Sequence, residues 1–132
     1  MISDWLMKYE SVLLLAAGDR AEFVEGLVKL GISSKIIDYN PKYSNKENYI
    51  CKDFIFDNVE LNTECIVHYN CEKTWPIGKI YKGDMILIGD NDMHNGDCNP
   101  ISSHEQLIEQ NGITEVYNKI IDGKHFRHWC LC

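Results

Sequence analysis

The stretch that decides the fold is residues 11–31, SVLLLAAGDRAEFVEGLVKLG. Its first half is compatible with two structures. Apolar residues recur at steps of three and four from Ile2 to Ala16, which predicts an amphipathic helix that begins near Ser3 and ends at Gly18. Residues 12–15, however, are apolar at every position, so they could instead form a buried strand. We expect the helix and keep the strand as the alternative.

The second half of the stretch predicts a second helix. Asp19 and Glu22 have the spacing of a capping box, in which side chains satisfy the free N–H groups at a helix start. A helical stripe of apolar residues follows, and Gly31 is a good residue to end it. The first 31 residues therefore predict two helices around a tight turn.

Strands are expected in the middle of the chain. Segments rich in aromatic and β-branched residues lie between turn-forming residues at 49–56, 64–69 and 85–88. Residues 40–48 and 90–100 are loops by composition.

The C-terminal part is predicted to hold two helices and a strand. Ser102 has a capping spacing before an apolar face that Asn111-Gly112 ends. Residues 113–121 fit a helix, although Asp122-Gly123 is also a strong hairpin signal. Residues 125–131 predict a final strand. The predicted fold is one α+β domain over residues 1–132, with an N-terminal helix pair, a mostly antiparallel central sheet, C-terminal helices and a last strand.

The charge of the chain excludes two classes of partner. It has 20 Asp and Glu against 13 Lys and Arg, a net charge of −7. Binding to nucleic acid or to an anionic membrane needs a basic surface, so neither is expected. The acids are clustered: residues 83–118 hold seven acids and no Lys or Arg, and residues 53–72 hold five acids and no base.

Clustered acids predict a surface that binds a cationic protein. A solvated face is the ordinary explanation for one acidic run, but two such runs favour electrostatic steering of a partner. Trp75 is the aromatic residue best placed to anchor such an interface. The predicted partner-binding acids are Asp57, Glu60, Glu64, Glu72, Asp84, Asp90, Asp92, Asp97, Glu105 and Glu109.

No motif predicts a cofactor, a metal site or a catalytic centre. The Asx-rich run from Asp90 fails the EF-hand pattern, which needs Gly and Glu where Asn95 and Ile101 stand. The four His and Cys residues of 125–132 lie on one short run, unlike the paired knuckles of zinc sites. The chain is therefore not expected to be an enzyme. A small metal- or thiol-dependent enzyme, using Cys98 or the His128–Cys132 tail, is the alternative.

The size, the acidity and the base-free runs 53–72 and 83–118 resemble the small immunity proteins of bacterial toxin systems, including contact-dependent inhibition. The resemblance implies a cytosolic protein that binds and blocks a cationic toxin domain, such as a nuclease. One branch of those proteins has Leu-Pro after its second helix, where this chain has Leu30-Gly31. A DNA-mimicking regulator of a host protein is a further alternative. The chain shows no secretion signal and no span of about 20 apolar residues, which predicts a cytoplasmic location.

Overall fold

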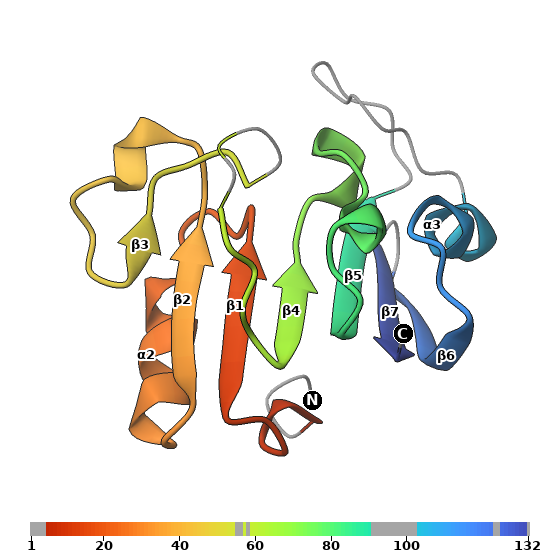
Figure 1. The fold of residues 1–132 in the computed structure, drawn as a ribbon, viewed down its shortest axis with the longest axis horizontal. Helices are drawn as coiled ribbons and strands as arrows, with labels where there is room; N and C mark the ends of the chain where they lie inside the picture. Colours follow the sequence, from red (N-terminus) through yellow and green to blue (C-terminus); the bar gives the residue numbers. More distant parts are fainter. Residues whose placement is uncertain (1–4, 55–56, 58, 91–102, 123–124, 132) are drawn as a thin grey trace. The chain divides into compact units, whose positions relative to one another are not determined.

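The computed structural model of the chain describes residues 5–54, 57, 59–90, 103–122 and 125–131 (Figure 1). Among these residues the strands are hydrogen-bonded in the orders β3-β2-β1-β4 and β5-β7-β6. The strands are β1 (Ser11–Leu15), β2 (Ser33–Ile37), β3 (Tyr49–Ile50), β4 (Cys65–His68), β5 (Asp84–Asp90), β6 (Glu115–Asp122) and β7 (His125–Leu131). The helices are α2 (Ala21–Lys29) and α3 (His104–Gln110), with the 3-10 helices η1 (Pro41–Tyr43), η2 (Cys71–Lys73) and η3 (Ile77–Lys79). Two compact units divide the chain, residues 1–66 and 67–132.

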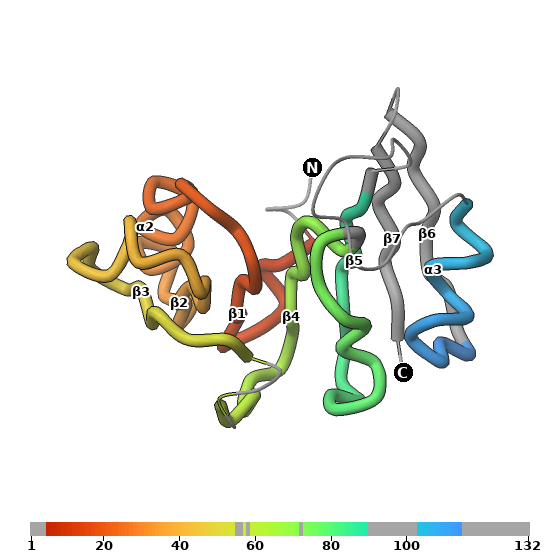
Figure 2. The backbone as a smooth tube through the Cα atoms, turned by 90° about the horizontal axis from the view of Figure 1, so that it is seen from above, coloured from red at the N-terminus to blue at the C-terminus, as the bar shows by residue number. Residues whose placement is uncertain are grey.

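The first unit is a parallel β-α-β arrangement. β1 pairs with β2 in parallel from Ser11↔Ser33 to Leu15↔Ile37, and β2 pairs with β3 in parallel. A parallel pair needs a crossover connection, which α2 supplies. Figure 2 shows α2 on one side of β1 and β2, and the segment that leads to β4 on the other side. Val24 and Leu27 are the buried residues of α2.

The prediction of a helix over residues 3–18 is wrong, because residues 11–15 form β1. Val12, Leu14 and Leu15 are fully or almost fully buried, and Leu13 is half-buried. A strand covered on both faces is apolar at successive positions, so its pattern can match helical steps by coincidence. The alternative of a buried strand is confirmed. Strand β2 had no sequence prediction at all.

The helix predicted after Asp19 is confirmed as α2, but its start differs from the prediction. Arg20 is the N-cap residue and makes no side-chain capping bond. Gly31, with φ of 84°, follows the helix as expected. Among the described residues of the predicted strand at 49–56, Tyr49 and Ile50 form the strand β3, and residues 51–54 belong to no strand.

The second unit contains the antiparallel part of the sheet. β7 pairs antiparallel with both β5 and β6, and β6 and β7 form the hairpin that Asp122-Gly123 signals. The strands predicted at 64–69, 85–88 and 125–131 are confirmed as β4, β5 and β7. Helix α3 is capped by the Ser103 hydroxyl, which accepts the Gln106 N–H at 3.1 Å, one residue later than predicted.

The helix predicted over residues 113–121 is wrong, because β6 occupies residues 115–122. The β6–β7 register shifts between Val116 and Asn118, as in a β-bulge. An extra residue in a strand breaks the period of two and leaves apolar residues three and four apart. The irregularity therefore accounts for the neighbouring apolar residues Val116 and Tyr117, while Ile120 and Ile121 lie in a regular part of the β6–β7 ladder.

These findings correct the predicted fold class. The sheet is not mostly antiparallel: β3, β2 and β1 run parallel, and the antiparallel pairs described are those of β7. The predicted N-terminal helix pair is also wrong, since β1 occupies residues 11–15 of the predicted first helix, and α3 is followed by the strands β6 and β7. The assignment of residues 1–132 to a single domain stays a prediction. The loop predicted at 90–100 lies, after Asp90, outside the described residues.

Candidate functional site

The turn between β1 and α2 has an unusual backbone. Ala16 and Gly18 both have positive φ, 53° and 59°. This region is costly for a residue with a Cβ, so Ala16 needs support from its surroundings. Part of that support is the Ala16 N–H, which donates to the Ile37 carbonyl at 3.0 Å and extends the β1–β2 ladder by one residue. The turn thus begins directly at the carboxyl ends of two parallel strands.

Asp38 follows β2 and binds this turn through its side chain. The Gly18 N–H donates to Asp38 Oδ2 at 3.0 Å, and the Asn40 N–H donates to Asp38 Oδ1 at 2.9 Å. The Asp38 residue is only 7% exposed. A carboxylate is rarely so buried without partners, and here two backbone N–H groups supply them. Each oxygen keeps a second lone pair that a ligand hydroxyl could use.

Tyr49 of β3 binds the same turn from another side. Its hydroxyl donates to the Gly18 carbonyl at 2.5 Å and accepts the Arg20 N–H at 3.1 Å. The Tyr49 ring stacks on Tyr43, with ring centroids 5.4 Å apart and ring planes 24° apart. Side chains from β2 and β3 therefore hold backbone groups of residues 18 and 20.

An ion pair lies at the outer edge of the turn. Lys46 Nζ is 2.9 Å from Asp19 Oδ1, and both side chains are exposed. The hydrogen bond from Lys46 lowers the pKa of Asp19, and the same bond raises the pKa of Lys46. Because water screens an exposed pair, its contribution to stability is small. The ammonium of Lys46 balances the carboxylate of Asp19, so the pair adds no net charge to the turn.

The arrangement suits a ligand with neighbouring hydroxyls and a flat ring. In open α/β sheets ligands bind outside the carboxyl ends of the strands, where Asp38 lies. Tyr39, the next residue, is 65% exposed and presents an aromatic ring at the surface. A carboxylate beside an exposed ring can bind a ribose and stack against a base.

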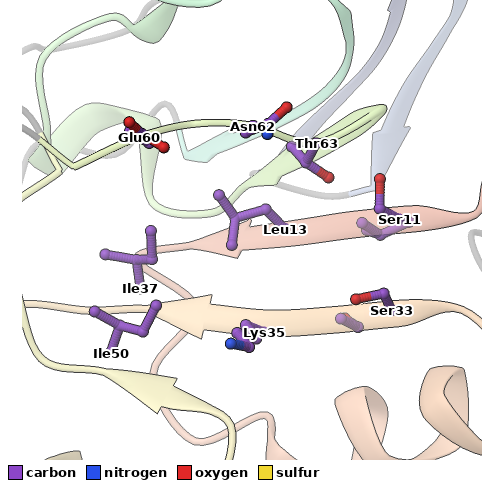
Figure 3. Close-up of a pocket in the computed structure, with 11 residues that line it drawn as sticks. Ser11, Leu13, Ser33, Lys35, Ile37, Ile50, Glu60, Asn62 and Thr63 are labelled. Atoms are coloured by element: carbon purple, nitrogen blue, oxygen red, sulfur yellow. The ribbon is translucent and has the colours of Figure 1, made fainter.

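A separate groove of about 240 Å³ lies on β1 and β2, on the face that residues 60–63 cross (Figure 3). Leu13, Ile37 and Ile50 line its apolar part, and Lys35 and Glu60 belong to its polar lining.

The side-chain contacts described at the turn are made by Asp38, Tyr49, Asp19 and Lys46, none of which is a predicted partner-binding residue. In the first unit, Asp57, Glu60 and Glu64 are exposed, and Glu64 lies at the start of β1, where its N–H donates to the Ser11 hydroxyl. In the second unit, Trp75 is 52% exposed, and Glu105 and Glu109 are exposed on α3.

The remaining predicted residues are less fully placed. Asp84 begins β5, while the side chains of Glu72 and Asp90 are not described, and Asp92 and Asp97 lie outside the described residues. Partner binding by all these residues stays a prediction.

The structure does not place the residues of the metal and thiol alternatives. Cys98 and Cys132 lie outside the described residues, and nothing is described of the side chains of β7. Within the described part of the chain, no group of His, Cys, Asp and Glu side chains could hold a metal ion. No helix in that part is long and apolar enough to cross a membrane. The cytoplasmic location stays a prediction.

Sequence analysis missed Asp38, Tyr39 and Tyr49. One signal could have found Asp38: it stands 20 residues after Gly18, each directly following an apolar run, with a helical stripe between them. Such a spacing of a glycine turn and an acid is typical of a β-α-β nucleotide site. No pattern in the sequence indicates a functional role for Tyr49.

No protein-family model matches the chain, and no curated protein matches it by sequence. Solved structures do match its fold. TehB from Haemophilus influenzae superposes with a TM-score of 0.64 at 16% identity, over 98% of this chain and 60% of that one. Methyltransferase CalO6 superposes with a TM-score of 0.59 at 10% identity, over 98% of this chain and 60% of that one. The S-adenosylmethionine-dependent methyltransferase SibL superposes with a TM-score of 0.55 at 13% identity, over 96% of this chain and 51% of that one.

These matches show that the chain has a methyltransferase-like fold, and that it spans between 51% and 60% of the length of these three proteins. They overturn the resemblance to toxin-immunity proteins, and with it the interpretation of the chain as a non-enzymatic inhibitor. The alternative that the chain is an enzyme agrees better with this fold. Fibrillarin, which matches with a TM-score of 0.59 at 14% identity over 92% of this chain and 72% of that one, was solved with its partner Nop5p, but it indicates no cognate toxin.

Proposed function

We propose that the chain is the cofactor-binding part of an S-adenosylmethionine-dependent methyltransferase. The observation that carries this proposal is the buried carboxylate of Asp38, which follows β2 and binds the Gly18 N–H of the turn after β1. The fold shared with SibL and CalO6 supports the same reaction class.

The residues at this turn fit the nucleoside part of the cofactor. A ribose offers two neighbouring hydroxyls, which are donors, and the Asp38 oxygens are acceptors with a lone pair to spare. The exposed ring of Tyr39 is available to stack on an adenine base. Asp38 and Tyr39 are therefore the residues that would hold the ribose and the base. When bound, the cofactor supplies a methyl group on a positively charged sulfur.

The same turn is poorly suited to a dinucleotide. Dinucleotide sites place a phosphate on free N–H groups at the turn and the helix start. Here the N–H of Gly18 donates to Asp38, and the N–H of Arg20 is shared between the Tyr49 hydroxyl and the Gly18 carbonyl, each at 3.1 Å. These features disfavour a phosphate but not a sulfonium cation.

Isothermal titration calorimetry tests the proposal. Purified chain is titrated in turn with S-adenosylmethionine, S-adenosylhomocysteine and NAD⁺. We expect the first two to bind with one site per chain and NAD⁺ to give no binding heat. Glu109→Gln, which removes an exposed acid of α3, is the control and should bind as the wild type does. Absence of binding by both sulfur compounds would contradict the proposal, and binding of NAD⁺ alone would indicate a dinucleotide enzyme instead.

A further inference from the structure

Tyr49 is fixed in place by the backbone on both sides of it. The Ile36 N–H donates to the Asn48 carbonyl at 2.8 Å, and the Asp38 N–H donates to the Ile50 carbonyl at 3.1 Å. These bonds attach the short strand β3 to the end of β2. The position of the Tyr49 ring is therefore set by the strand that also carries Asp38.

The Tyr49 side chain has little freedom to rotate. Its ring stacks on the buried ring of Tyr43, and its hydroxyl uses both its donor and an acceptor position on the turn. A tyrosine held at both ring and hydroxyl is more rigid than one held by either alone, because each contact removes a different rotation.

The turn depends on contacts from outside itself. Two of its residues, Ala16 and Gly18, have positive φ, and a strained backbone persists only where its surroundings determine it. Asp38 binds the N–H of Gly18, whereas Tyr49 binds the carbonyl of Gly18 and the N–H of Arg20. Without Tyr49 the second half of the turn would lose the side-chain contact that links it to β3.

We propose that Tyr49 is a positioning residue of this site: its hydroxyl fixes residues 18–20 in the shape that receives the nucleoside, and it keeps the Arg20 N–H away from the ligand. The nature of the ligand rests on the proposed function, but the effect of Tyr49 on the turn does not. Tyr49 need not touch the cofactor, since it acts through the backbone of Gly18 and Arg20.

Two matched variants test this role. Tyr49→Phe removes only the hydroxyl that binds the turn. Tyr43→Phe removes the hydroxyl of the stacked neighbour, for which no hydrogen bond is found in the described part of the chain. Amide hydrogen exchange, followed by NMR, reports on the Arg20 N–H directly, and the Leu14 N–H inside β1 serves as an internal reference for general loosening.

We expect Tyr49→Phe to speed exchange at Arg20 about fivefold, with no change at Leu14, because the Arg20 N–H loses the Tyr49 hydroxyl but keeps the Gly18 carbonyl as a second acceptor. The same variant should weaken the binding of S-adenosylhomocysteine, measured by calorimetry, by about tenfold. Tyr43→Phe should leave both quantities within about twofold of the wild type.

Different results separate the two proposals. Equal exchange at Arg20 in the two variants, or faster exchange at Arg20 with unchanged affinity for S-adenosylhomocysteine, would overturn the role of Tyr49. Faster exchange at Leu14 as well as Arg20 would also overturn it, because that result describes a general loss of stability. If the wild type does not bind S-adenosylhomocysteine, the proposed function fails, and the exchange at Arg20 alone then decides whether Tyr49 fixes the turn.

Discussion

Asp38→Asn is the substitution that tests the site most directly. Asparagine has the shape of aspartate but carries one acceptor oxygen in place of two. In the structure the two carboxylate oxygens accept different N–H groups, those of Gly18 and Asn40. The amide can serve only one of them, and its NH₂ group then faces the other N–H as a second donor.

The size of the effect follows from these two bonds. Hydrogen bonds to a charged group contribute about 1.5–3 kcal/mol each, and neutral ones about half as much. Asp38→Asn loses one charged bond and weakens the other, so we expect the free energy of unfolding to fall by about 2–4 kcal/mol. Asp38 is 7% exposed, so water cannot replace the lost partner easily. A loss of this size is a large part of the stability of a small protein.

Urea denaturation followed by circular dichroism measures this loss. Asp19→Asn is the control, because it removes an exposed carboxylate from the same turn and should leave the unfolding midpoint unchanged at high salt. Where Asp38→Asn is still folded, its affinity for S-adenosylhomocysteine should fall at least about tenfold. An unfolding midpoint and an affinity equal to those of the wild type would refute the reasoning, since Asp38 would then support neither the turn nor the ligand.

Two further predictions concern the second unit and the packing of glycines. A Cβ at Gly78 would lie 1.9 Å from the Asn111 carbonyl oxygen, so Gly78→Ala should lower the urea midpoint strongly, whereas Gly26→Ala on α2, with no atom within 4 Å, should raise the free energy of unfolding by about 0.5–1 kcal/mol. An equal effect of the two substitutions would contradict this. Burial lowers the pKa of His68 from 6.5 to about 3, so the unfolded chain binds a proton that the folded chain does not, and stability should fall as pH drops from about 6.5 toward 3. His68→Gln should flatten that pH dependence. The free energy of unfolding, measured by urea denaturation at several pH values between 4 and 7, checks this: the same dependence on pH in the variant and the wild type would show that His68 is not its source.

Elements with a strong local pattern could be predicted from the sequence. Helix α2 has an apolar stripe, charged residues on its outer side and Gly31 at its end, and these features act within one segment. Strand β4 is short, apolar and β-branched, and β7 follows a hairpin signal. In these segments local preference and tertiary structure agree.

Elements that depend on distant contacts could not be predicted. Strand β2 begins Ser33-Ser34-Lys35, which has no alternation of apolar and polar residues, and it is a strand because β1 and β3 pair with it. The apolar run in β1 was ambiguous for a different reason. A strand that is buried on both faces lacks the alternation of apolar and polar residues by which a strand is recognised. The acidic clusters misled the functional interpretation because the distribution of charge along a sequence bears on solubility and association, and carries no information about the fold.

The contacts that build the candidate site explain why the fold is visible in structure but not in sequence. Asp38 and Tyr49 bind main-chain atoms, namely the N–H and carbonyl of Gly18 and the N–H of Arg20. A main-chain atom is present whatever the side chain, so such contacts restrict the partner residue only through its backbone conformation. Gly18 is restricted by its positive φ, but Arg20 is not restricted by the bond that its N–H makes. A site built in this way can keep its geometry while most of the surrounding side chains change. The substitutions that damage it should therefore be those at Asp38 and Tyr49, which supply the side chains.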